Sequence, residues 1–128
     1  MIKEYADKLL ELVNIERTKA GVKPLTATPL MHTLAAIRAA ELEIYYSHFR
    51  PDGREFYTIF DEFGIEITGK AGENLFMKHS TPESVVDGWL QSEFHRNQLL
   101  DEKFNTIGVG VHMDDNGTFY WVLLFMEE

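Results

Sequence analysis

The sequence predicts an α+β fold, a three-layer α–β–α sandwich in which a small antiparallel sheet lies between helices. Three observations carry this prediction. Apolar residues recur at helical spacing through much of the first hundred residues. The C-terminal segment has the pattern of a β-hairpin with an Asn-Gly turn. Its last strand, residues 119–126, is apolar on both faces, which indicates a central strand covered on both sides. The 128 residues contain no repeat or linker, so we expect one domain over residues 1–128.

Two amphipathic helices are predicted at the N-terminal end. Apolar residues between Ile2 and Val13 are three or four positions apart, and Gly21 is placed to cap the end of this helix. The pair Thr28-Pro29 offers a capping hydroxyl followed by proline at the first helical position. We expect this second helix to run to about Tyr46.

The middle of the chain is predicted to contain a turn, a short helix and a strand. Residues 50–54 carry the proline, aspartate and glycine of a turn. Residues 56–63 have the spacing of a short amphipathic helix that stops at Gly64. In residues 65–78 the period changes to two, and we expect a strand over the second half, with Glu73 on an apolar face.

The remaining elements follow from start signals and periodicity. A helix is predicted from Thr81-Pro82 to about Phe94, with a further helical turn over 96–100. Residues 107–111 are predicted to pair with residues 119–126 through the turn at 114–117.

Composition excludes several classes of function. Twelve Lys and Arg against 21 Asp and Glu give a net charge of −9, the opposite of what nucleic acid or anionic lipid attracts. The absence of cysteine excludes disulfides and thiol catalysis. No apolar run approaches the length of a membrane span, and the first residues lack the apolar core of a signal peptide. We therefore expect no stable membrane insertion and no signal peptide in these 128 residues.

Three ionisable residues stand at positions suited to chemistry. His48 and His95 lie at predicted element junctions, and Glu73 lies among apolar strand residues. Together they could bind a divalent cation or perform acid–base work. The structural alternatives are that each histidine only bonds a helix end, and that Glu73 is the buried ion-pair partner of an arginine (Arg38, Arg54 or Arg96). His32 falls off the apolar stripe and is expected to be solvated.

An ordered set of motifs resembles bacterial domains of the CAP superfamily, which comprises cysteine-rich secretory, antigen 5 and pathogenesis-related 1 proteins. The motifs are Leu12–Arg17 with Ala20–Leu25, Ala36-x-Arg38-Ala39-x-Glu41-Leu42, Ser47-His48-x-Arg50-Pro51-Asp52-Gly53-Arg54, Gly72-Glu73-Asn74-Leu75, Trp89-x-x-Ser92-x-x-His95-Arg96 and Phe104-x-x-Ile107-Gly108-Val109-Gly110. They span nearly the whole chain, and the family's fold is an α–β–α sandwich.

The resemblance implies a central cleft with two histidines and two glutamates, in which the histidines often bind zinc. His48 and His95 match these histidines, and Glu73 matches one glutamate. The second glutamate is replaced by Ser92, with Glu93 beside it. Cleft support is expected from Glu73, Asn74, Ser92 and Glu93. A second departure is Gln98, where bacterial members usually carry asparagine.

The resulting hypothesis is an extracellular or cell-surface binding module whose cleft holds a divalent cation, such as zinc, through His48 and His95. One alternative is a metal-assisted hydrolase with Glu73 as general base. The other is a metal-free module that binds a lipid or small ligand. We expect no nucleic-acid partner. A small ligand, a lipid and a protein all remain open as partners, and non-enzymatic function is favoured because no nucleophile motif is present.

Overall fold

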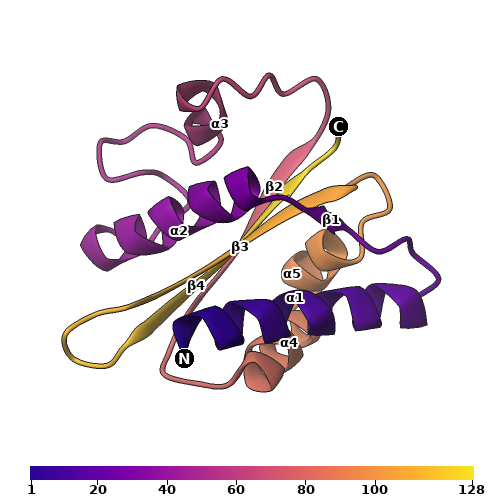
Figure 1. Ribbon diagram of the computed structural model, residues 1–128, viewed down its shortest axis with the longest axis horizontal. Coiled ribbons are helices and arrows are strands. Elements are labelled where there is room, and N and C mark those ends of the chain that lie inside the picture. The colour runs from indigo at the N-terminus through magenta and orange to yellow at the C-terminus, as the bar shows by residue number, and fades with distance from the viewer.

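A four-stranded sheet lies between two layers of helices (Figure 1), and the computed structural model describes residues 1–128. The strands are β1 (Thr26–Ala27), β2 (Ala71–Met77), β3 (Thr106–Met113) and β4 (Phe119–Met126), in the order β1-β3-β4-β2. β4 pairs antiparallel with both β3 and β2, which confirms the predicted sheet. The two-residue β1, which the sequence did not predict, adds a parallel pair beside β3.

The helices divide between the two faces of the sheet (Figure 1). α2 (Pro29–Ile44) and α3 (Thr58–Glu62) cover one face, and α1 (Ile2–Lys19), α4 (Pro82–Gln91) and α5 (Glu93–Leu99) cover the other. The side chains of Thr28 and Thr81 cap α2 and α4 as predicted. α2 ends two residues earlier than predicted. α4 stops at Gln91 and not near Phe94, because Ser92 is extended and begins α5. No helix is both long enough and apolar enough to cross a membrane.

β4 is the centre of the hydrophobic core, as its sequence predicts. All eight of its residues are buried, and alternate side chains enter two separate clusters on the two faces. One set packs against α1 and α4 and consists of Phe119, Trp121, Leu123 and Phe125. The other set packs against α2 and α3 and consists of Tyr120, Val122, Leu124 and Met126.

Two glycines of β3 allow α2 to lie directly on the sheet. A Cβ on Gly108 would lie 2.1 Å from the carbonyl oxygen of Met31, and a Cβ on Gly110 would lie 2.2 Å from that of Ala35. Since backbone atoms cannot give way as a flexible side chain can, any larger residue would push α2 outward. This close approach fixes the helix that carries Arg38.

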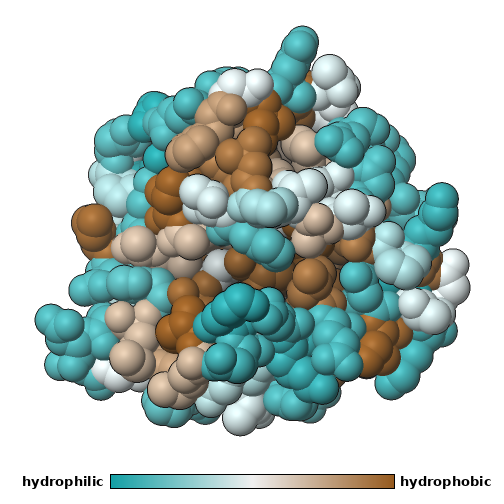
Figure 2. All heavy atoms as spheres, in the orientation of Figure 1, coloured by the Kyte–Doolittle hydropathy of each residue, from teal (hydrophilic) through white to brown (hydrophobic).

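His32 covers part of the open edge of β3. β1 pairs only with Thr106 and Ile107, so the rest of this edge has no neighbouring strand. The N–H of Val109 donates to His32 Nδ1 over 3.0 Å. His32 is therefore half-buried and hydrogen-bonded, and the expectation that it is solvated is wrong. Figure 2 shows apolar side chains along the furrow between α1 and α2 on this side of the molecule.

A buried arginine ties α1 to the segment after α5. Arg17 has no exposed surface, and its guanidinium donates to four backbone carbonyl oxygens (Lys23, Leu99, Asp101 and Phe104). Burial lowers the pKa of Arg17 from its ordinary value. These bonds hold the C-terminal end of α5, the helix that carries His95.

Candidate functional site

Two adjacent residues of β2 reach into opposite layers of the sandwich. β2 is an edge strand, and successive side chains of a strand point to opposite faces. Glu73 bonds to groups from α2 and the loop after it, whereas Asn74 bonds to α5. His48 and His95 are therefore anchored at the same edge of the sheet from its two sides.

Glu73 is held by a bidentate ion pair. Arg38 Nε donates to Oε2 over 2.7 Å and Nη2 donates to Oε1 over 3.0 Å, and neither side chain has exposed surface. Although burial opposes its charge, Glu73 holds the pKa of Arg38 above its ordinary value. Among the three arginines considered from the sequence, Arg38 is thus the partner. The same Oε1 also lies 2.9 Å from His48 Nδ1.

The loop that carries His48 is tied back to α2 by charged groups. Arg38 Nη2 donates to the carbonyl oxygen of Ser47, and Arg38 Nη1 donates to Glu41, each over 2.9 Å. Arg50 donates to the same Glu41 carboxylate over 2.7 Å. Although burial opposes ionisation, hydrogen bonds from Arg50 and Arg38 lower the pKa of Glu41. This network fixes the backbone on both sides of His48.

His95 is placed by the interruption between α4 and α5. Because Ser92 is extended, its Oγ lies at the start of α5, 2.9 Å from His95 Nδ1. Asn74 Nδ2 donates to the carbonyl oxygen of His95 over 3.1 Å, and Trp89 Nε1 donates to that of Leu75 over 2.9 Å. These bonds clamp the helix junction to β2.

His95 lies within the electrostatic influence of His48. Burial, and then the charge of His48, lower the pKa of His95 from its ordinary value of 6.5. Burial and the charge of Glu73 likewise raise the pKa of Tyr46, which places this phenol near the same carboxylate. At neutral pH His95 is therefore uncharged, the state in which an imidazole binds a metal ion.

The groups that could contribute to a cation site here are two histidine ring nitrogens. Each histidine uses Nδ1 in a hydrogen bond, which leaves both Nε2 atoms without a protein partner. No three His, Asp or Glu side chains are grouped so that they could hold a metal ion. Glu73 is engaged by Arg38 and His48, and Glu93 is exposed with no bond to either histidine. A divalent ion here would take the remaining ligands from water.

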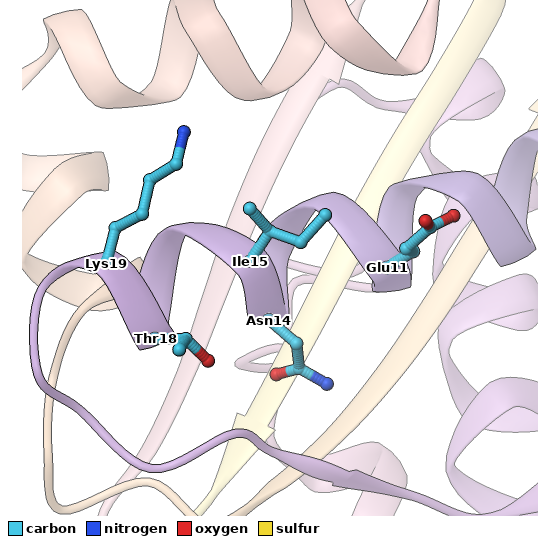
Figure 3. Close-up of a pocket in the computed structure, with 5 residues that line it drawn as sticks. All are labelled: Glu11, Asn14, Ile15, Thr18 and Lys19. Carbon is cyan, nitrogen blue, oxygen red and sulfur yellow. The ribbon is translucent and has the colours of Figure 1, made fainter.

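A hollow over α1 does not form a chemical site. It has a volume of about 440 Å³ and is lined by Glu11, Asn14, Ile15, Thr18 and Lys19. Figure 3 shows that these side chains leave the helix in different directions and do not converge on one point. Asn14 is already occupied, because its amide bonds both backbone groups of Leu25.

Comparison with known proteins finds one family over most of the chain. The profile of the cysteine-rich secretory protein family (CAP) matches residues 10–125. An uncharacterised protein of Bacillus subtilis, YkwD, is 35% identical over 111 residues, which cover 85% of this chain and 43% of the relative. The chain thus spans less than half of that relative.

Solved structures show the same fold. An extracellular protein with an SCP domain from Bacillus anthracis superimposes with a TM-score of 0.88 at 25% identity, over 98% of this chain and 41% of the other. An outer surface protein of Borrelia burgdorferi superimposes with a TM-score of 0.90 at 19% identity, over 100% and 96% of the two chains. The second likeness concerns the fold alone.

Proposed function

Because this chain belongs to the cysteine-rich secretory protein (CAP) family, we propose that it is a binding module whose cleft holds a divalent cation, such as zinc, between His48 and His95. The observation that carries the proposal is the bond between Glu73 and His48 Nδ1, with Glu73 itself fixed by Arg38. A carboxylate on one ring nitrogen orients a histidine and strengthens the other nitrogen as a metal ligand. Ser92 orients His95 in the corresponding way.

The two sides of the site have different ligand strengths. His48 is paired with a carboxylate, which supports a basic Nε2, whereas His95 is paired with a neutral hydroxyl. With two protein ligands, the affinity should lie well below that of structural zinc sites with four. Such a site suits a reversible ligand bridge more than a permanent structural ion.

The geometry supports binding over hydrolysis. Glu73 is buried and both of its oxygens accept bonds from Arg38, so its role is to position His48 and not to take a proton from water.

Extracellular or surface location is proposed from relatives, since two structures of similar fold are of an extracellular protein and an outer surface protein.

Calorimetric titration of metal-stripped protein with zinc tests the proposal. We expect binding of about one ion per chain that is lost in the His48→Ala/His95→Ala variant. His79→Ala is the matched control, because His79 is an exposed histidine remote from the cleft. Full zinc binding by the double variant, or no binding by the wild type, would refute the cation site.

A further inference from the structure

We propose that a polar hollow beside His95 binds a neutral, hydroxyl-rich ring, of the size of a single sugar unit. The hollow has a volume of about 170 Å³ and is lined by Lys70, Phe94, Asn97, Gln98 and Asp101. It lies on the α5 side of β2 and uses neither His48 nor Glu73. The inference therefore goes beyond the proposed cation site and does not depend on it.

Gln98 lines the hollow, and its side chain has an unused hydrogen-bond acceptor. Its Oε1 is buried without a partner, and it lies against Gly72, where a Cβ would be only 2.3 Å away. A ligand donor reaches this oxygen only if the Gln98 amide turns towards the hollow, and since a buried polar atom without a partner is unfavourable, such a turn on ligand binding would be favourable. The Gln98 side chain thus lies at the boundary between Gly72 and the hollow.

The charged groups of the hollow neutralise each other. Lys70 Nζ is bonded to the Asp101 carboxylate, and it lies 5.3 Å from the centre of the Phe104 ring. An ammonium has three donors and a carboxylate about four acceptor sites, so both groups retain bonding capacity. The exposed amide of Asn97 adds a donor and an acceptor. Donors and acceptors without net charge favour a hydroxyl-bearing ligand over an ion.

Phe94 supplies an apolar surface next to these polar groups. Phe94 is a large hydrophobic residue, yet it is 58% exposed. Its ring meets the His95 ring edge-on, with ring centres 5.5 Å apart and planes at 81°. The C–H face of a sugar ring can pack on such an aromatic face while its hydroxyls reach the polar groups. The volume equals about six water molecules, which limits the ligand to one ring.

Chemical-shift mapping of the whole chain with methyl glucoside, methyl galactoside and methyl N-acetylglucosaminide tests this inference. At least one glycoside should shift the amide signals of residues 70 and 94–101 at millimolar concentration. Phe94→Ala should raise its Kd about fivefold, because one aromatic contact is lost. Gln98→Asn should also weaken binding.

Phe63→Ala is the matched control, since Phe63 is a large apolar residue, 40% exposed, at the end of α3. It should leave the Kd unchanged. The inference is refuted if no glycoside shifts these signals, if Phe94→Ala binds as tightly as the wild type, or if free lysine or acetate shifts them more strongly than any glycoside does.

Discussion

Replacing Arg38 with methionine should strongly destabilise the protein. The guanidinium donates to Glu73 twice and to Glu41 and Ser47, and it has no exposed surface. Methionine fills a similar space but leaves the Glu73 carboxylate buried with only His48 as partner. Breaking a buried ion pair on one side costs about 3–5 kcal/mol. For a chain of this size, that corresponds to a fall of roughly 10–20 °C in Tm.

Urea unfolding followed by the fluorescence of the buried Trp89 and Trp121 measures this loss. Arg54→Met is the matched control, because Arg54 also bonds carboxylates but its side chain is 47% exposed, so its free energy of unfolding should hardly change. The double variant Arg38→Met/Glu73→Leu should lose less free energy of unfolding than the two single variants lose together. The difference should be about 2 kcal/mol. If Arg38→Met lost no more than Arg54→Met, or if the single losses simply added, the buried pair would not be the anchor of His48.

Three further predictions concern the frame and the second histidine. Gly110→Ala should lower the free energy of unfolding by about 2–3 kcal/mol, because its Cβ would press on the carbonyl oxygen of Ala35; Gly88→Ala, which meets only the edge of a ring at 3.2 Å, should cost less in the same urea assay. Arg17→Met should cost about 3 kcal/mol or more, since four carbonyl oxygens lose their donor, and Arg17→Lys should recover part of this loss. The lowered pKa of His95 means that the unfolded chain takes up its proton first. The contribution of His95 to the free energy of unfolding is therefore fully present above pH 6.5, the ordinary pKa. It declines as the pH falls through 6.5 towards the pKa of the folded state. Wild type should therefore lose more stability from pH 8 to pH 5 than His95→Gln, and equal losses would contradict the assigned direction.

The parts of the fold that the sequence predicts well are those with strong local signals. Thr28-Pro29 and Thr81-Pro82 start helices because capping depends on a few adjacent residues. β1 was missed because two residues show no periodicity, and they pair with β3 only through the tertiary structure. The predicted α2 is too long for a related reason: its end is set by tertiary packing and not by the local apolar pattern. Tyr45 continues the apolar stripe, but its backbone is extended and its side chain is exposed where packing on the sheet has ended.

The hydrogen bonds around Glu73 could be predicted from the sequence only in part. A carboxylate at Glu73 on a buried strand face requires a partner, and the sequence offered three arginines at equal standing. The choice of Arg38 depends on the depth and rotation of α2, which Gly108 and Gly110 set by close packing. The bonds made by Ser47 and Glu41 were missed because they depend on where the helix ends.

The position of the two histidines on opposite sides of one edge strand has a mechanical consequence. His48 is fixed through Glu73 to α2, and His95 is fixed through Asn74 and Ser92 to the layer of α4 and α5. A ligand that bonds both Nε2 atoms would join the two helical layers across the outer edge of β2. No further strand lies beyond this edge. Its binding free energy would then add directly to the stability of the sandwich, because the unfolded chain cannot present both rings at once. The loss of either anchor should weaken such a bridge even if both histidines remain, because the anchors orient the two rings without touching the ligand.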